Sequence, residues 1–513
     1  MKRVLLPLLG LAVACAPPAG GQMVAAPERA DDVLAAIDRI GTEDSRVREL
    51  AQVLLDSIGP RLTGSPGMRA AGEWAVKTYA SWGIGARQEP YGQWENWRRG
   101  ITHLDLLEPR VRTLEATMLA WSPGSNGVRT GPALLMPAVA DLPEFERWLP
   151  TAAGKMVLLD AAEVTCRPVE NWEEWGRPET VQRLEAAQEA AEAAWTARLR
   201  ATGLGGAELL RRLEAAGAAA LLTSNWSQGW GVSKVYSAGT RTVPMINLGC
   251  EDYGLVFRLA ENEQGPVLRL QAEAESLGTA PVANTIATIA GRELPNEFVL
   301  LSAHFDSWDG SSGATDNGTG TVVMMEAMRI LKQVLPNPRR TIIAAHWNGE
   351  EQGLNGSSAF AADHPEIVEG LQVLLNQDNG TGRIATVQME GFAEAETVFR
   401  RWLGQVPDEL ASGIELRSPG TPSRSGSDHS SFICHGAPAF FLSSRSWDYG
   451  TYTWHTDRDT FDKLVFEEVQ NNAKLVAMLA YLASESSERF PRDRAPVAAS
   501  NGWPACRVPD RGR

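Results

Sequence analysis

The stretch that decides the fold is "RTIIAAHWNGEEQG" at residues 340–353, where an apolar run ends in two adjacent glutamates. The run from Thr341 to Ala345 has the composition of a buried β-strand, because short apolar runs next to turn residues favour that structure. Glu350 and Glu351 follow closely, and neighbouring carboxylates repel each other. The pair has no obvious structural role, so we expect another group to stabilise its two negative charges.

Composition limits the class of protein. The chain has 513 residues, of which 43% are hydrophobic and 22% charged, and its formal net charge is -15. A chain of this length and composition is typical of a globular protein with about two to four domains. The acidity argues against a nucleic-acid partner, because phosphate binding requires a basic face. It is also typical of an ordinary solvated surface.

The N-terminus has the pattern of an export signal. Lys2 and Arg3 precede an apolar run at 4–14, which is shorter than the roughly 20 apolar residues of a membrane-spanning helix. We therefore expect residues 1–15 to be a signal and the mature chain to have no transmembrane segment. Small residues before Cys15 resemble a bacterial lipoprotein signal, although Ala12 stands where leucine is preferred. Lipidation of Cys15 in the cell envelope or periplasm, and ordinary secretion, both stay open.

Four cysteines remain after such a signal: Cys166, Cys250, Cys434 and Cys506. An even number in an oxidising compartment permits disulfides. Their spacing does not determine which cysteines pair, and no two of them have zinc-ribbon spacing.

Patterning divides the remaining chain into four stretches. Residues 28–122 open with apolar residues at helical spacing. Residues 123–277 hold short apolar runs around an Ala-, Glu- and Arg-rich segment that we expect to form a solvent-facing helix. Residues 278–485 alternate strand and helix patterns, which favours an α/β fold with a mostly parallel, mixed sheet flanked by helices. Residues 486–513 are predicted to form a loose tail.

Polar residues at the ends of the expected strands form the candidate site, because ligands of open α/β sheets bind outside the carboxyl ends of the strands. A histidine after one strand is usually just hydrogen-bonded, and an aspartate before glycine usually makes a turn. Repetition along successive strands is what favours a site. The residues are His304, Asp306, Asp316, Glu350, Glu351, Asp378 and His455.

Clustered carboxylates with two histidines indicate metal ions, because an unpaired buried carboxylate is costly or takes up a proton. Zinc accepts histidine nitrogen and carboxylate oxygen. Five such ligands are too many for one tetrahedral ion with an open position, but they fit two ions about 3.5–4 Å apart that share a bridging carboxylate. One glutamate of the pair is then free to act as general base. Manganese or cobalt would also suit this ligand set.

Five segments in order resemble the co-catalytic di-zinc exopeptidases of metallopeptidase family twenty-eight, which includes aminopeptidases and glutamate carboxypeptidases. They are "LLSAHFDSWDGSSGATDNGTG", "WNGEEQG", "LNQDNG", "GSDHSSF" and "WHTDRDTFD", and the first looks closest to the carboxypeptidase Q branch. The resemblance covers most of the chain after the signal. It implies a zinc-peptidase (phosphorylase/hydrolase-like) fold in two parts, 28–122 and 278–485, around a smaller β-rich protease-associated domain at 123–277.

The resemblance also implies an activity. It implies a hydrolase that acts on short peptides or dipeptides, with aminopeptidase action favoured over carboxypeptidase action. The inserted domain would shape access to the site or support a homodimer, and no residue pattern chooses between these roles.

Individual roles follow from the motifs. His304 and Asp378 would bind one zinc ion, Glu351 and His455 the other, and Asp316 would bridge them.

The resemblance also implies the residues that act beside the metals. Glu350 would be the general base, and Asp306 would accept the second N–H of His304 and fix its tautomer. Tyr449, Tyr452 and Trp454 are candidates for binding substrate or the oxyanion. Some relatives carry a tyrosine donor where this chain has Trp454.

Other residues receive weaker predictions. Arg383, Arg424 and Arg445 are candidates for a substrate carboxylate, although each has the pattern of an ordinary surface arginine. Asp428 and Asp459 are expected to support the site rather than to bind metal.

One histidine is set aside. His346 is expected to be a packed residue at a strand end rather than a ligand.

Two alternatives stay open. Glutaminyl-peptide cyclases use the same scaffold with a single zinc ion, and "WHT" at 454–456 is similar to them. Receptor-like ectodomains keep the fold without the ligands, but here every ligand position and Glu350 are present. Metal stoichiometry separates the first alternative from a di-zinc peptidase.

Overall fold

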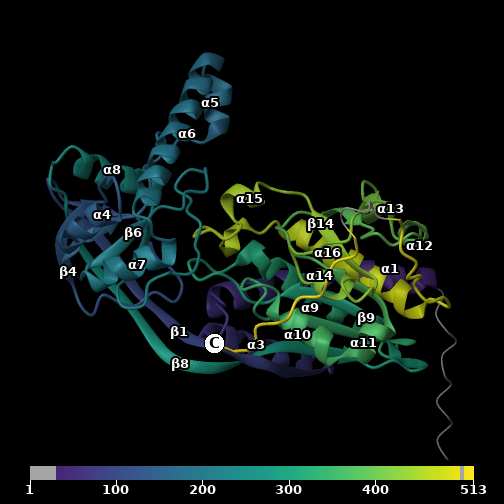
Figure 1. Cartoon of the computed structure of the whole chain (residues 1–513). Helices are drawn as coiled ribbons and strands as arrows, with labels where there is room; N and C mark the ends of the chain where they lie inside the picture. The colour runs from purple at the N-terminus through teal and green to yellow at the C-terminus, as the bar shows by residue number, and fades with distance from the viewer. Residues whose placement is uncertain (1–29, 497–501, 513) are drawn as a thin grey trace, which may run out of the picture.

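The computed structural model describes residues 30–496 and 502–512, so the expected signal at 1–15, Cys15 included, lies outside the described residues. A mixed sheet of 14 strands flanked by helices runs through these residues (Figure 1). The predicted α/β class with a mixed sheet is confirmed. None of the helices in the described ranges is both long enough and apolar enough to cross a bilayer.

The centre of the catalytic part is a set of parallel strands. Strand β9 (Leu294–His304) lies between β10 (Arg340–Trp347) and β11 (Leu371–Asn376) and is parallel to both. Strand β14 (Ala439–Ser444) continues the parallel set beside β11. The apolar runs recognised in the sequence therefore form adjacent strands whose carboxyl ends share one edge of the sheet.

Both faces of this sheet are covered by helices. Successive strand residues point to opposite faces, so a strand of continuous apolar residues has an apolar surface on each face that a helix can bury. Val299 and Leu301 belong to the larger core, whereas Leu300 between them belongs to the core on the other face. The helices of the larger core include α1 (Ala30–Glu43), α2 (Val47–Gln52), α3 (Pro66–Ser81), α9 (Thr319–Val334) and α16 (Phe466–Glu485). Those on the opposite face include α10 (Asn355–Asp363), α11 (Pro365–Gly370) and α14 (Ser430–Ile433).

Two unusually long strands join the catalytic part to a second body. Strands β1 (Gly85–Glu108) and β8 (Val267–Ile289) pair antiparallel along their lengths and run beneath both bodies (Figure 1). A separate hydrophobic core fills the second body, and it includes Leu104 and Met118, which precede the boundary predicted at residue 123. The second body therefore draws on residues from before, within and after the predicted insertion.

The second body differs from the β-rich domain that the sequence predicted. Its strands, most of them three or four residues long, alternate with helices. The strands are β3 (Ala116–Met118), β4 (Arg129–Leu135), β5 (Met156–Leu158), β6 (Ala220–Thr223) and β7 (Met245–Leu248), with β4 to β7 parallel. The helices include α4 (Leu142–Trp148), α5 (Val169–Trp175), α6 (Pro178–Ala201), α7 (Gly206–Ala215) and α8 (Cys250–Glu261).

Helix α6 matches the solvent-facing helix expected from its charges. Trp195 is its one buried residue among those described, and the helix projects from the second body together with α5 (Figure 1). A disulfide joins Cys166 to Cys250 in the same body.

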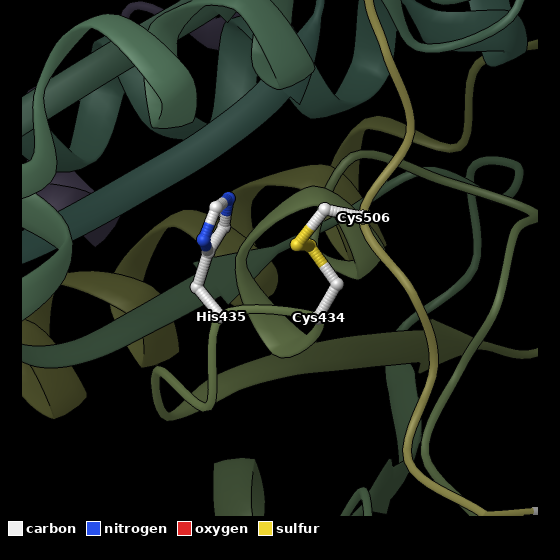
Figure 2. Close-up of side chains that lie close together, drawn as sticks. All are labelled: Cys434, His435 and Cys506. Carbon is white, nitrogen blue, oxygen red and sulfur yellow. A yellow bond between two sulfur atoms is a disulfide. The ribbon is translucent and has the colours of Figure 1, made fainter.

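The C-terminal segment differs from the loose tail that the sequence predicted. A disulfide joins Cys506 to Cys434 (Figure 2), and the side chain of Phe490 is buried in the larger core. Arg511 forms an ion pair with Asp363 on α10. Composition alone does not reveal a covalent anchor, and this is why the segment looked loose.

The central strands should dominate the stability of the catalytic part. Ile342 on β10 is fully buried, so Ile342→Ala should destabilise the protein by about 2–5 kcal/mol and lower its thermal midpoint. Val111→Ala is the matched control, because Val111 is 77% exposed. Equal midpoints for the two variants, measured by circular dichroism, would contradict this packing.

Candidate metal centre

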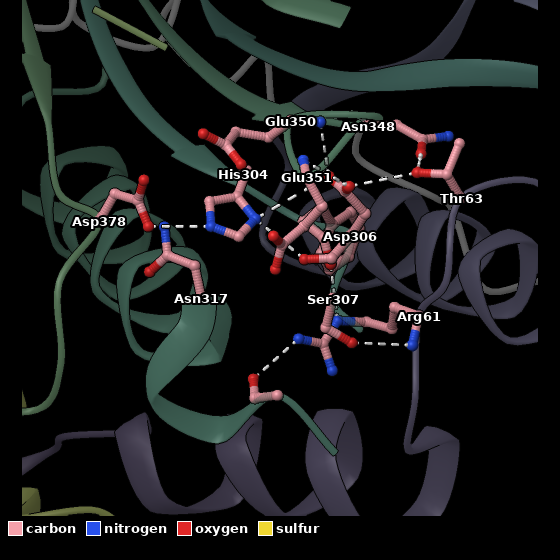
Figure 3. Close-up of polar contacts among 12 residues, drawn as sticks. Arg61, Thr63, His304, Asp306, Ser307, Asn317, Asn348, Glu350, Glu351 and Asp378 are labelled. Atoms are coloured by element: carbon pink, nitrogen blue, oxygen red, sulfur yellow. Dashed lines mark hydrogen bonds and ion pairs between the residues drawn. The ribbon is translucent and has the colours of Figure 1, made fainter. Parts of the chain in front are cut away.

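The carboxyl ends of β9, β10 and β11 bring the predicted polar residues to one edge of the sheet. Trp347 on β10 pairs with His304 at the end of β9, so the Glu350–Glu351 loop starts beside that histidine. Asp378 follows β11 on the other side of β9. The structure thus brings these side chains into one site, as the strand pattern predicted (Figure 3).

The five predicted ligand residues form two groups that share Asp316. His304 Nε2 lies 2.9 Å from Asp378 Oδ1 and 3.2 Å from Asp316 Oδ1. His455 Nε2 lies 2.9 Å from Glu351 Oε2 and 3.4 Å from Asp316 Oδ2. Within each group the candidate ligand atoms all lie within 4.8 Å of one another. Asp316 thus directs one carboxylate oxygen to each group, as a bridging ligand must.

The charges at the site are not balanced by the described residues alone. Burial, reinforced by nearby carboxylates, raises the pKa values of Glu350 and Glu351 well above the usual range for glutamate. Asp316 Oδ2 and Glu351 Oε1 are buried and lack hydrogen-bond partners among the described residues. Oxygen and imidazole donors that are left unsatisfied in this way fit divalent cations such as zinc.

Asp306 accepts the second N–H of His304, as predicted, but through its backbone carbonyl rather than its carboxylate. His304 Nδ1 donates to the backbone carbonyl of Asp306 at 2.9 Å, and the nearest side-chain oxygen of Asp306 is 3.9 Å away. The Asp306 carboxylate instead accepts the backbone N–H groups of Glu350 and Glu351, both at 3.2 Å. Thr63 donates its hydroxyl to the same carboxylate at 3.1 Å. Asp306 therefore fixes the glutamate loop, while its backbone orients the histidine.

A second aspartate holds the loop that carries Asp316. Asp459 accepts the backbone N–H groups of Thr315 and Asp316 at 2.8 and 3.0 Å. This contact gives Asp459 the supporting position that the sequence suggested. Asp428 is also buried near the site, where burial, with Asp378 and Asp306 nearby, raises its pKa to about 8.

A buried arginine that sequence reasoning missed holds the loop between His304 and Asp316. Arg61 donates to the carbonyls of Phe305 and Ser312, both at 2.7 Å, and to that of Gly313 at 3.0 Å (Figure 3). Its burial lowers the pKa of the guanidinium to about 10. An arginine within the apolar "IGPRL" stretch was the available signal, because a charge there needs buried partners.

A loop of the second body packs against His455. Tyr236 of this loop and Trp308 of the loop after β9 both contact the ring of His455 edge-on, and the backbone N–H of Val235 donates to the His455 carbonyl at 2.7 Å. Lys234 donates to the Trp454 carbonyl at 2.9 Å. Nothing in the sequence indicated that this loop reaches the site.

The predicted substrate residues have different outcomes. A cavity of about 440 Å³ opens over the site and is lined by Tyr449 and Trp454, but not by Tyr452. Burial of the Tyr449 hydroxyl, together with nearby carboxylates such as Asp316, raises the pKa of this side chain well above the usual range for tyrosine. The Tyr452 ring instead lies against Gly229 of the second body.

None of the three predicted arginines lines this cavity. Arg383 forms a bidentate pair with Glu468 at 2.7 Å, and Arg424 donates to the Gly502 carbonyl. Arg507 lines the cavity instead, and sequence reasoning missed it because it lies in the expected loose tail.

His346 has the packed position expected for it. It is buried and lies 2.7 Å from the Tyr79 hydroxyl, and burial lowers its pKa to about 3.

Comparison with known proteins agrees with this geometry. Residues 284–480 match the family model described as Peptidase family M28. The chain is 26% identical to carboxypeptidase Q of Mus musculus over 467 residues, which cover 90% of this chain and 91% of that protein. It is 33% identical to leucine aminopeptidase 1 of Arthroderma otae over 211 residues, which cover 37% of this chain and 55% of that protein.

Solved structures show the same fold. A peptidase M28 precursor from Shewanella amazonensis SB2B matches with a TM-score of 0.64 and 23% identity, covering 91% of this chain and 99% of that one. BSAP, a zinc aminopeptidase from Bacillus subtilis, matches with a TM-score of 0.54 and 20% identity, covering 87% and 98%.

The fold and the acidic, histidine-containing site define a metallohydrolase. Residues 284–480 form a peptidase family M28 domain, and the chain is a metallo-exopeptidase that is similar over most of its length to carboxypeptidase Q.

The loop-fixing contact of Asp306 predicts how an isosteric change should act. Asp306→Asn replaces one carboxylate oxygen by an amide nitrogen, which cannot accept an N–H group. One of the two backbone contacts to the glutamate loop is then lost, so kcat should fall by about 10- to 100-fold. KM should change less, and the pH–rate profile should shift because Glu350 moves. Steady-state kinetics on a dipeptide across pH measure both effects. Asp408→Asn, an exposed aspartate, is the control, and an unchanged kcat in Asp306→Asn would contradict the role.

Proposed function

We propose that this protein is a di-zinc exopeptidase that hydrolyses short peptides. The observation that supports this proposal is the pair of three-residue groups that share Asp316. Each group offers one imidazole nitrogen and carboxylate oxygens, a donor set suited to zinc. His304 and Asp378 would hold one ion, Glu351 and His455 the other, and Asp316 both. Manganese or cobalt would also suit these donors.

Bound zinc would polarise the scissile carbonyl and lower the pKa of the attacking water. Glu350 lines the cavity beside Glu351 but belongs to neither group, so its carboxylate stays available for proton transfer. It accepts the proton of the water and returns it to the leaving amine nitrogen. Asp306 holds the backbone N–H of Glu350 and so positions this base.

The oxyanion formed at the substrate carbonyl needs a hydrogen-bond donor. Tyr449 lines the cavity together with the proposed ligands, so its hydroxyl is the donor that we favour. Trp454 lines the same cavity and would contact the substrate side chain.

Cleavage from the amino end is the favoured direction. Glu350 lines the cavity and is not a proposed ligand, so its carboxylate would attract a protonated amino terminus in this partly desolvated site. One relative is named a carboxypeptidase and another an aminopeptidase, so the names of the relatives do not favour either direction of cleavage.

The single-zinc cyclase is a less suitable alternative. Glu351 and His455 complete a second group with Asp316, and a single-zinc enzyme would not need it. The inactive receptor-like ectodomain is likewise disfavoured, because the ligand residues and Glu350 converge on one cavity.

Export and the nature of the second body are part of the proposal. Two disulfides, Cys166–Cys250 and Cys434–Cys506, suit an oxidising compartment such as the bacterial periplasm or the outside of the cell. A signal at 1–15 would direct the chain there, and Cys15 would carry a lipid anchor if it is modified. We assign the second body to the protease-associated type, with a separate core and a loop that reaches the site.

The proposed base gives a sharp kinetic prediction. Glu350→Gln keeps the size of the side chain but cannot accept the proton, so kcat should fall by about 10²- to 10⁴-fold. Zinc content, measured by elemental mass spectrometry, should stay that of the wild type, because Glu350 is not a proposed ligand. Glu394→Gln is the control at an exposed site. Undiminished peptidase activity in Glu350→Gln would rule out the mechanism.

A further inference from the structure

We propose that Arg507 binds the free carboxylate of a short peptide substrate, which makes the enzyme select dipeptides over substrates with a blocked carboxyl end. Arg507 belongs to residues 502–512, which we call the C-terminal strap. This inference rests on the proposed peptidase function and specifies its substrate.

The strap is anchored on both sides of Arg507. Immediately before it, Cys506 is joined by a disulfide to Cys434 (Figure 2). After it, the backbone N–H of Asp510 donates to Asn355 Oδ1 at 2.9 Å. Arg507 therefore projects from a segment that is fixed within a few residues in each direction.

Further contacts hold the ends of the strap. Arg511 pairs with both oxygens of Asp363 at 2.7 and 2.9 Å, and its carbonyl accepts the backbone N–H of Gln93 at 2.8 Å. Trp503 donates its indole N–H to the Ile433 carbonyl at 2.7 Å. Such a set of contacts keeps the guanidinium of Arg507 near the cavity and limits the conformational entropy that binding would cost.

Arg507 faces the loop that carries the proposed base. It lines the cavity together with Glu350 and Glu351, and Gly353 of the same loop lies beside its guanidinium. A Cβ atom at Gly353 would lie 3.7 Å from Arg507 Nη1, and the φ of this residue is +111°. Glycine therefore suits the backbone of this turn and leaves open space beside the guanidinium.

The guanidinium has no counter-charge of its own. Arg507 makes no hydrogen bond or ion pair with the residues in 30–496 and 502–512. Four carboxylates line the cavity, but all four have other proposed work: Asp316, Glu351 and Asp378 as ligands, and Glu350 as base. Arg507 is the one lysine or arginine in the lining of this cavity, so it remains for the substrate.

A carboxylate is the group that such an arginine recognises. The guanidinium fork binds both carboxylate oxygens, and these charge-assisted bonds are stronger than neutral ones. A dipeptide carries its carboxylate one residue beyond the scissile bond, and a cavity of about 440 Å³ is in the range for a small ligand. Its amino end would meet the acidic side of the cavity and its carboxylate the arginine.

The test compares three substrates that share one N-terminal residue: a dipeptide, the same dipeptide with a C-terminal amide, and the aminoacyl 4-nitroanilide. Wild-type enzyme should favour the free dipeptide. Arg507→Ala should lower kcat/KM for the dipeptide by about 10- to 100-fold, chiefly through KM, because a charge-assisted bond is lost. The amide and the anilide should change by less than about twofold, since neither carries the carboxylate that the bond requires.

Two further variants separate recognition from structure. Arg507→Lys keeps the charge but not the fork, so its dipeptide KM should lie between those of the wild type and Arg507→Ala. The double variant Cys434→Ser and Cys506→Ser releases one anchor of the strap and should raise the dipeptide KM selectively as well. Val508→Ala is the matched control, because Val508 is the next residue and is 93% exposed.

Each contrary outcome has a distinct meaning. Equal losses on the dipeptide and its amide in Arg507→Ala would overturn the inference and leave the peptidase function standing. The same holds if wild-type enzyme cleaves the amide as well as the free dipeptide. If zinc-loaded wild-type enzyme cleaves none of the three substrates, the proposed function fails and this inference fails with it.

Discussion

Carboxylates that share one buried cavity repel one another, and the site of this protein depends on how that repulsion is offset. Backbone N–H groups neutralise part of the charge, because Asp306 and Asp459 each accept two of them. Oxygens of Asp316 and Glu351 are left without such donors. Divalent cations would offset the remaining charge and leave the carboxylates deprotonated, as the proposed ligands and base require.

The order of the sheet is what creates this constraint. Parallel pairing of β9 with β10 and β11 forces their carboxyl ends to one edge, so each strand delivers its polar residues to the same place. Helix α9 begins just after Asp316 and is buried along most of its length, which helps to fix the loop that carries Asp316. The packing that stabilises the fold therefore also brings the carboxylates together. Hydrogen bonds from Arg61 and to Asp459 keep the loop between His304 and Asp316 in position.

Chemistry and selectivity come from different parts of the chain. In the proposed mechanism the strand ends supply the groups for hydrolysis, and two outlying segments contact the site or its cavity. One is the loop of the second body that contacts His455. The other is the C-terminal strap, which places Arg507 at the cavity. Neither segment belongs to the central sheet, but the loop of the second body also holds His455 in place.

The sequence predicted the catalytic strands and the convergence of the proposed ligands, because apolar periodicity and residues after strand ends are local signals. It did not predict the contacts of Asp306, since the direction of that side chain depends on a loop held by Arg61 from far along the chain. The strap was missed for a similar reason, because spacing does not reveal that Cys434 pairs with Cys506. Apart from α6, the helices of the second body were not predicted either, because the apolar runs there are too short to indicate which structure connects them.

The number of metal ions bound per chain shows directly whether two cations share Asp316. Elemental mass spectrometry on zinc-loaded protein, purified by gel filtration, should give two zinc ions per chain for the wild type. Asp316→Ala should retain clearly less than half of that amount, because both groups lose a ligand. A single zinc ion in the wild type, or two zinc ions retained by Asp316→Ala, would contradict the shared site.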